Sequence, residues 1–151
     1  MKRILVQQRP KTSFGRLYPR YDDESGILAV ESRIKRPWPF GVDVDGTIVF
    51  DLDEARLLAN FDLHIPRARW ERSLPEEQSF ATAEAADIEF TDETVRQKSF
   101  HLPIRARTDA GARRLLVQIG DARPTNSVAL SERCVALLAG NELVGFLITG
   151  L

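Results

Sequence analysis

The chain has 151 residues, of which 43% are hydrophobic and 28% charged, and its formal net charge is −1. These values are typical of one soluble globular domain. The balanced charge argues against sequence-independent binding to nucleic acid, which needs a large positive excess. No run of about twenty apolar residues is present, so we expect no membrane span. Cys134 is the single cysteine, which excludes an intrachain disulfide and makes the cytoplasm the expected compartment.

Short apolar, partly β-branched segments separated by turn residues predict a β-rich first half over residues 1–66. The strands predicted there are residues 3–8, 17–21, 27–31, 42–45, 48–53 and 57–65. The loop 33–41 contains two prolines that hold it extended around Trp38. We therefore expect a hairpin, an irregular loop and a three-stranded β-meander.

The meander predicted at residues 40–65 turns first at Asp45-Gly46. Apolar residues alternate with aspartates on both sides of this dipeptide, as expected of an antiparallel sheet with one solvated face. An Asp-Gly pair between such segments is the strongest short-range hairpin signal. Residues 53–58 also have the composition of a helix start.

The segment 43–47, of sequence Asp-Val-Asp-Gly-Thr, resembles the first motif of the haloacid dehalogenase-like phosphatases. The resemblance implies a Mg²⁺-dependent phosphatase with Asp43 as nucleophile and Asp45 as general acid/base. That family places a buried strand before the motif and a loop and helix after it. Here two prolines and a glycine precede the motif, and residues 48–52 form a β pattern. We interpret the match as fortuitous, and keep Asp43 and Asp45 as the alternative catalytic or metal-binding pair.

The remaining chain is predicted to hold a linker, residues 67–90, and a second β half, residues 91–151. Ser73 followed by acidic residues favours a short helix from Ser73 to Ala86. The strands predicted beyond it are residues 88–90, 101–107, 114–120, 128–130, 134–138 and 143–149. The two halves are expected to form one compact domain.

The two meanders align without gaps at an offset of 86 residues (128 − 42). The pairs are Val42 with Val128, Val44 with Leu130, Val49 with Val135, Leu52 with Leu138, Leu57 with Leu143 and Leu58 with Val144. Such internal repetition indicates two copies of one structural unit. Because residues 139–142 have the composition of a turn, residues 53–56 are predicted to be a turn rather than a helix. The two motif aspartates correspond to Ala129 and Ser131, so the shared scaffold does not require carboxylates there.

Tyr21-Asp22, an apolar strand at 27–30, an Asp-rich strand at 48–53 and a Leu-rich strand at 57–63 form a further pattern. Over residues 21–63 this pattern resembles a small uncharacterised bacterial β-rich family. The resemblance implies a β-rich fold and no known activity.

Candidate binding residues gather in two places. Trp38 stands in a proline-held loop beside Arg36 and Phe40, a composition typical of protein-binding hot spots; the alternative is that Trp38 folds over the end of the sheet. Arg69 and Trp70 form a second candidate. No nucleophile–base–orienter set can be named around the two histidines, and Cys134 lies in an apolar segment that predicts burial.

The sequence therefore predicts an α+β, mostly β protein with two similar antiparallel meander halves and at most one or two short helices. The favoured function is a non-catalytic protein-binding module, such as a bacterial immunity or antitoxin-like protein, without a cofactor. The alternatives are the phosphatase and a β domain that binds a small ligand between its halves. Unpaired edge strands also favour a homodimer.

Overall fold

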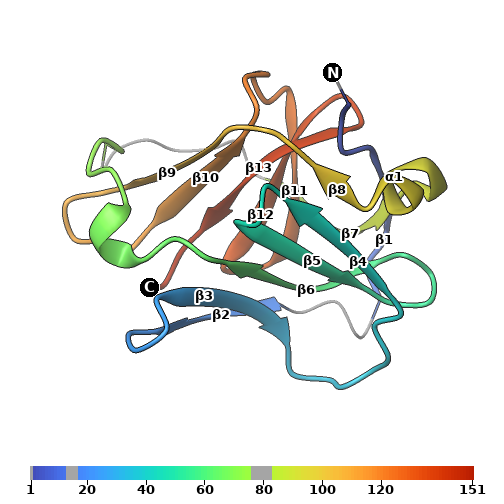
Figure 1. The fold of residues 1–151 in the computed structure, drawn as a ribbon, viewed down its shortest axis with the longest axis horizontal. Helices are drawn as coiled ribbons and strands as arrows, with labels where there is room; N and C mark the ends of the chain where they lie inside the picture. The colour runs from blue at the N-terminus through green and yellow to red at the C-terminus, as the bar shows by residue number, and fades with distance from the viewer. Residues whose placement is uncertain (1, 13–16, 76–82) are drawn as a thin grey trace.

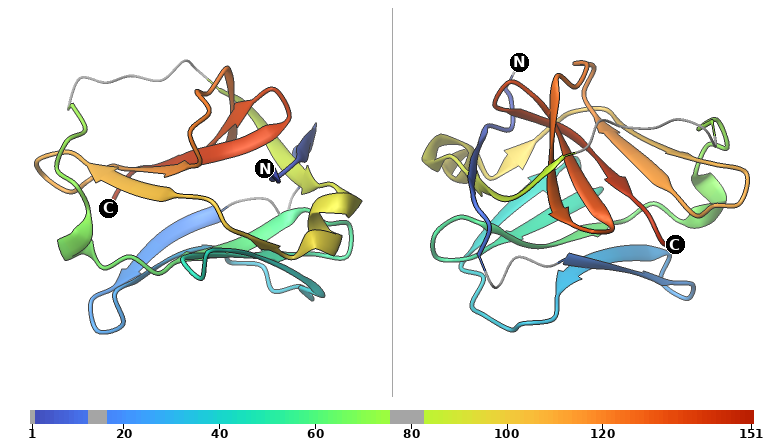
Figure 2. Two further views of the ribbon diagram at one scale, coloured as in Figure 1. Left: turned by 45° about the horizontal axis from the view of Figure 1, so that its top comes forward. Right: turned by 180° about the vertical axis from the view of Figure 1, so that it is seen from behind.

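A computed structural model describes residues 2–12, 17–75 and 83–151, which fold into two β-sheets packed face to face (Figures 1 and 2). One sheet has the strands β2 (Leu17–Asp22), β3 (Ile27–Ser32), β4 (Phe40–Val44), β5 (Ile48–Leu52), β6 (Leu58–Leu63) and β8 (Ser99–Phe100). The other has β1 (Val6–Pro10), β7 (Glu84–Phe90), β9 (Ile104–Thr108), β10 (Leu115–Ile119), β11 (Asn126–Ser131), β12 (Cys134–Ala139) and β13 (Glu142–Ile148). A 3₁₀ turn, η1 (Arg67–Arg69), and one α-helix, α1 (Asp92–Gln97), complete the described elements. The prediction of a mostly β, α+β chain is confirmed.

The predicted repeat is present in the topology of the two sheets. The order is β2-β3-β6-β5-β4-β8 in one sheet and β1-β7-β11-β12-β13-β10-β9 in the other. In each, a hairpin joins a meander through its inner strand, β3 with β6 and β10 with β13. A parallel strand then flanks each meander, β8 beside β4 and β7 beside β11. Each half of the chain therefore builds the core of one sheet.

The strand registers correct one part of the repeat. Leu52 faces Leu58, whereas the corresponding Leu138 faces Leu143. Leu58, rather than Leu57, is thus the counterpart of Leu143. Both meanders carry a β-bulge at this point, but the first turn is one residue longer than the second. The gapless alignment is therefore wrong beyond Leu52, because a turn absorbs the extra residue without changing the paired strands.

Two predicted elements differ from the structure. Residues 76–82 of the helix predicted at 73–86 lie outside the described residues, but Glu84 to Ala86 begin strand β7 and are not helical. Alternating burial of Ala86, Ile88 and Phe90 against the core outweighs the weak helix signal. The first strand also begins later than predicted, because Leu5 forms a separate bridge with Glu142 before β1 starts.

Helix α1 was not predicted, although its start signal is present in the sequence. The Thr91 side chain accepts a hydrogen bond from the Thr94 backbone N–H, and Asp92 and Glu93 occupy the first turn. A threonine cap followed by acidic residues satisfies free N–H groups and the positive end of the helix dipole. At six residues the helix is too short to show a hydrophobic period. In the described ranges no helix has the length and hydropathy that a membrane span requires.

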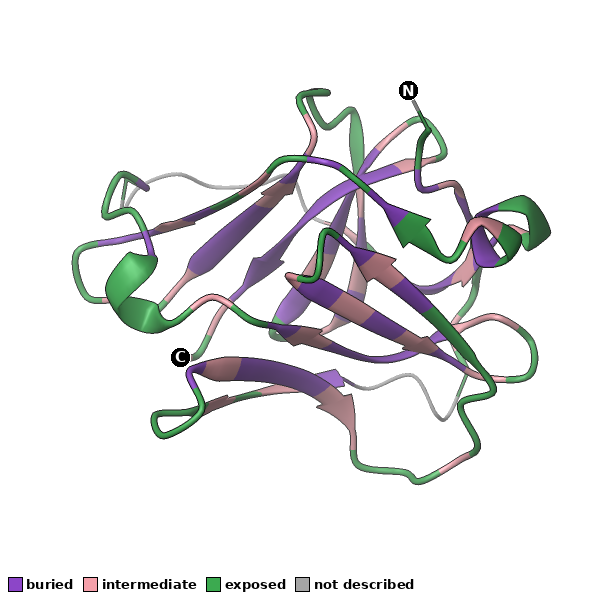
Figure 3. Cartoon of the chain, viewed as in Figure 1, coloured by how far each residue is buried: buried purple, intermediate pink, exposed green. Residues whose placement is uncertain are grey.

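The core between the sheets is centred on four phenylalanines. Phe50, Phe61, Phe90 and Phe146 are fully buried. Phe61 and Phe146 hold equivalent positions in the two halves, and their rings stack with centroids 4.4 Å apart. Figure 3 shows buried and more exposed residues alternating along the strands, as the period-two pattern predicts. Side chains therefore fill the centre of the space between the halves.

Candidate functional site

Asp45 and Gly46 form a tight hairpin turn between β4 and β5. Both have positive φ, 54° and 68°, as a type I′ turn requires. The Thr47 N–H donates to the Val44 carbonyl oxygen at 2.9 Å. The Asp43 carboxylate accepts from the Gly46 N–H at 3.1 Å. The predicted turn is confirmed, and Asp43 has a structural task in closing it.

The phosphatase motif does not occupy the setting that its family provides. An antiparallel strand, β5, follows the turn in place of a helix. Asp45 projects into solvent, where its Oδ1 lies 3.4 Å from Nδ1 of the exposed His101. Among the described residues, no three His, Cys, Asp or Glu side chains are grouped so that they could hold a metal ion.

The structure separates the candidate binding residues into exposed and buried ones. Trp70 is only 4% exposed: its indole Nε1–H donates to the Ile65 carbonyl oxygen, and its ring packs edge-on against Tyr21. Trp70 is thus a core residue with no indole surface for a partner. Arg69 is exposed on η1. Arg36 is largely covered and lies 3.3 Å from Asp53 in an ion pair, so it anchors the loop after β3.

Trp38 and Phe40 are exposed, and a third apolar side chain accompanies them. Ile34, Trp38 and Phe40 are 45%, 42% and 37% exposed. Among the described residues these are the exposed large apolar side chains, and all three belong to the segment 34–40, here called the apolar segment. Scattered exposed apolar residues are ordinary, but their concentration in one loop is typical of an interaction surface.

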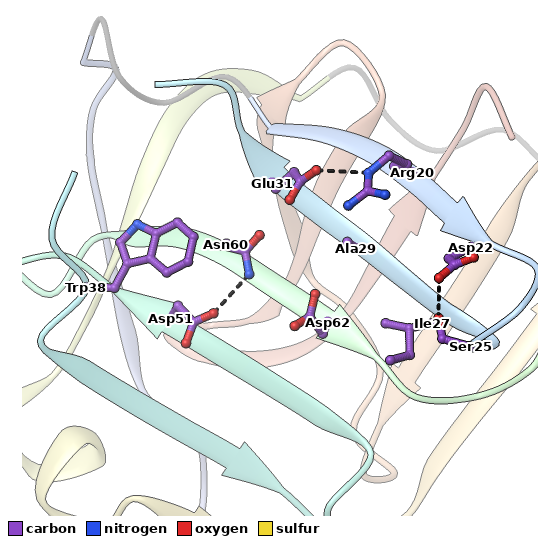
Figure 4. Close-up of a pocket in the computed structure, with 10 residues that line it drawn as sticks. All are labelled: Arg20, Asp22, Ser25, Ile27, Ala29, Glu31, Trp38, Asp51, Asn60 and Asp62. Atoms are coloured by element: carbon purple, nitrogen blue, oxygen red, sulfur yellow. Dashed lines mark hydrogen bonds and ion pairs between the residues drawn. The ribbon is translucent and has the colours of Figure 1, made fainter. Parts of the chain in front are cut away.

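Beside Trp38, the outer face of the six-stranded sheet carries a shallow groove of about 350 Å³ (Figure 4). We call it the acidic groove. Its polar lining consists of Arg20, Asp22, Ser25, Glu31, Asp51, Asn60 and Asp62. Arg20 is tethered to Glu31 at 3.1 Å. Among the described residues, the groove therefore holds four carboxylates against one guanidinium group.

Asn60 lies on the floor of the acidic groove, and its amide oxygen lacks a hydrogen-bond partner among the described residues. The residue is 4% exposed. Its Nδ2 donates to Asp51 Oδ2 at 2.9 Å, while its buried Oδ1 has no hydrogen-bond partner among the described residues. Turning the amide around would place oxygen against a carboxylate, so this orientation is the favourable one. A buried acceptor without a donor costs roughly 1–3 kcal/mol.

Asp62 is the groove residue whose ionisation is disfavoured. Partial burial raises the pKa of its carboxyl group, and repulsion from Asp51 raises that pKa further. Attraction by His64 and a hydrogen bond from Asn60 act in the opposite direction without cancelling the increase. The carboxylates of Asp51 and Asp62 therefore lie close enough to repel each other.

The other residues considered from sequence have structural roles. Cys134 is fully buried, and burial raises the pKa of its thiol to about 12, which keeps it protonated and unreactive. His64 is exposed, and its backbone N–H donates to the Thr47 carbonyl oxygen. Sequence reasoning did not single out Asn60, and it did not place Asp62 in a groove. Their alternation on β6 places both outward, but only the fold brings them beside Asp51 and Trp38.

No known protein-family profile matches this chain, and a search of curated proteins finds no relative either.

Proposed function

We propose that the protein is a non-catalytic protein-binding module that docks through the outer face of its six-stranded sheet. The observation that carries the proposal is the apolar segment, in which Ile34, Trp38 and Phe40 are exposed and Trp38 also lines the acidic groove. A large aromatic side chain next to charged groups is the usual composition of a binding hot spot. The carboxylates of the groove select a partner protein whose contact surface is basic around an apolar patch.

Blocking a partner is the action that suits a module of this kind. A small β-sandwich whose strands already form the face loses little backbone conformational entropy on docking. Bacterial immunity and antitoxin-like proteins act in this way, and we place the present chain in that functional class, acting in the cytoplasm. A second copy of the chain is the alternative partner, since β2 lies at the edge of the six-stranded sheet.

The test begins with capture of partners on the immobilised chain, identification by mass spectrometry and production of the identified protein in pure form. We expect Trp38→Ala to weaken binding of the pure partner at least about tenfold, because truncation removes the exposed aromatic anchor. Binding should also weaken as salt is raised, since opposite charges attract the two proteins.

Pro124→Ala is the matched control, because Pro124 is exposed in the loop before β11 that corresponds to the loop before β4. It should leave the affinity unchanged. Equal binding by wild type and Trp38→Ala would contradict the proposal. Sedimentation that finds a dimer lost in Trp38→Ala would instead assign the face to self-association.

A further inference from the structure

We propose that the acidic groove is a pocket for a single arginine side chain, held between the Trp38 indole and the polar groups of Asp51, Asn60 and Asp62. The partner protein of the preceding subsection would supply this arginine, so the biological setting rests on that proposed function. The chemistry of the pocket is a property of the isolated chain, and it can be measured without the partner.

The first argument is that the floor of the groove, formed by Asp51, Asn60 and Asp62, offers hydrogen-bond acceptors. Asn60 Oδ1 is a buried acceptor with no partner among the described residues. Asp51 receives one hydrogen bond from Asn60, and its other oxygen and the Asp62 carboxylate are acceptors only. Arg20, the cation among the described lining residues, forms an ion pair with Glu31 through its Nε. A ligand that satisfies this set must carry several donors.

The second argument is charge. Asp22, Glu31, Asp51 and Asp62 contribute four carboxylates to a groove with one guanidinium. A cation placed between Asp51 and Asp62 would relieve their mutual repulsion and interact with both. Charge-assisted hydrogen bonds of this kind are about twice as strong as neutral ones. An anion or a neutral polar ligand would neither relieve the repulsion between Asp51 and Asp62 nor bring a positive charge to their hydrogen bonds.

The third argument is the aromatic wall. Trp38 lines the groove at the end nearest Asp51 and Asn60 (Figure 4). A guanidinium group stacks on indole faces and presents five N–H donors in a planar fork, whereas an ammonium group is a compact, strongly hydrated charge. The acceptors come from two adjacent strands, β5 and β6, so a planar fork can reach more of them than a point donor can. Arginine is therefore favoured over lysine.

The volume and the cover of the groove agree with a single side chain. About 350 Å³ lies at the lower end of the range for small-ligand sites, enough for one long side chain. Asn60 Oδ1 has almost no accessible surface, so a ligand reaches it only when a neighbouring side chain shifts. Trp38 lines the groove and is 42% exposed, so it is a neighbouring side chain that the fold does not enclose.

The experiment is a titration of the isolated chain with N-acetyl-argininamide, followed by heteronuclear NMR. N-acetyl-citrullinamide, which has nearly the same shape without the charge, and N-acetyl-lysinamide are the comparison probes. We expect saturable shifts of the Trp38 indole N–H and the Asn60 side-chain amide, with a dissociation constant on the order of 1–10 mM for so small a ligand. The lysine probe should bind several-fold more weakly, and the citrulline probe should not saturate.

Asp62→Asn should weaken binding of the arginine probe about tenfold, because it removes one of the two charges that flank the cation. Asp45→Asn is the matched control: it makes the same change on the same sheet at the hairpin turn, where asparagine tolerates positive φ. It should leave the affinity unchanged. Equal shifts from the arginine and citrulline probes, no saturation with arginine, or equal weakening by both variants would overturn the pocket.

The outcomes separate the two proposals. A partner protein that depends on Trp38, combined with no binding of the arginine probe, would support the docking face and reject the arginine pocket. Saturable arginine binding that requires Asp62, combined with a purified partner indifferent to Trp38→Ala, would support the pocket and reject the docking face.

Discussion

The outer faces of the two sheets have opposite character although they are built on one topology. Asp51 in β5 corresponds to Leu137 in β12, because in each meander the β-bulge lies immediately after this residue. By the same registers Asp62 corresponds to Leu147. One face is thus an open groove with carboxylates, and the other is apolar. The inner faces, in contrast, meet at the equivalent rings of Phe61 and Phe146.

The apolar side chains of the other outer face are buried, whereas the carboxylates of the acidic groove reach solvent. Leu116, Leu137, Val144 and Leu147 form a second hydrophobic cluster outside the main core, and Leu74, from the segment after η1, packs on it. Repetition therefore reproduces strand order and inner packing, which the fold requires. The outer positions are free to differ, and in this protein they separate a covered face from an exposed one.

The largest effect is expected where the two halves are most alike. Phe61→Ala and Phe146→Ala should each lower the free energy of unfolding by about 3–5 kcal/mol, because each removes a fully buried ring and leaves a cavity. Urea denaturation measures both losses. A difference above about 2 kcal/mol between them would show that the two positions are equivalent in register but not in packing.

The next effect concerns Asn60 and its counterpart Gly145. In the second sheet a Cβ at Gly145 would lie 2.2 Å from the Val117 carbonyl oxygen, so no side chain fits. Gly145→Ala should cost about 3 kcal/mol or more, since a strand must move. Gly41→Ala, where the nearest atom is 3.7 Å away, is the control and should change stability by less than about 1 kcal/mol. An unchanged stability of Gly145→Ala would show that the second sheet can hold a side chain at the position equivalent to Asn60.

Exchanging the characters of the two faces should have unequal costs. Leu147→Asp places a carboxylate at a position that is 7% exposed, and should destabilise the fold by about 2–4 kcal/mol. Asp62→Leu, in the open groove, should be neutral or stabilising, because it removes the repulsion from Asp51. Thermal unfolding of both variants tests the difference. Equal losses would show that the groove aspartate supports the fold.

The smallest effect is a pH dependence of stability that arises from Asp62. Its pKa is raised in the folded protein, so the folded state binds a proton more tightly than the unfolded state. The contribution of Asp62 to stability therefore falls as pH rises from the usual carboxyl pKa of 3.8 through the raised value. Asp62→Asn should be more stable than wild type at neutral pH by less than about 1 kcal/mol, because solvent screens the group.

That advantage should disappear below pH 3.8, where the wild-type carboxyl group is protonated in both states. Melting temperatures of the two proteins across this pH range give the measurement. An advantage that persists in acid would assign the effect to hydrogen bonding in place of charge.

Local chemistry was enough to predict much of the architecture. The Asp45-Gly46 turn and the paired strands on either side of it follow from residues close together in the chain. The repetition of the meander follows from the recurrence of the same local pattern 86 residues later. Alternation of apolar and polar residues also predicted that Asp43 and Asp51 point outward and that Cys134 is buried. These features depend on backbone preferences and on a period of two, which a short segment expresses by itself.

Tertiary structure alone decided which surfaces stay open. Trp38 and Trp70 have similar arginine-rich neighbourhoods in the sequence, yet one is exposed and the other is in the core. The Asn60 Oδ1 atom is buried without a hydrogen-bond donor among the described residues. The pKa of Asp62 rises through burial and through repulsion from Asp51, which the pairing of β5 with β6 brings close. Burial and desolvation are sums over neighbours from distant parts of the chain, so no local pattern specifies them.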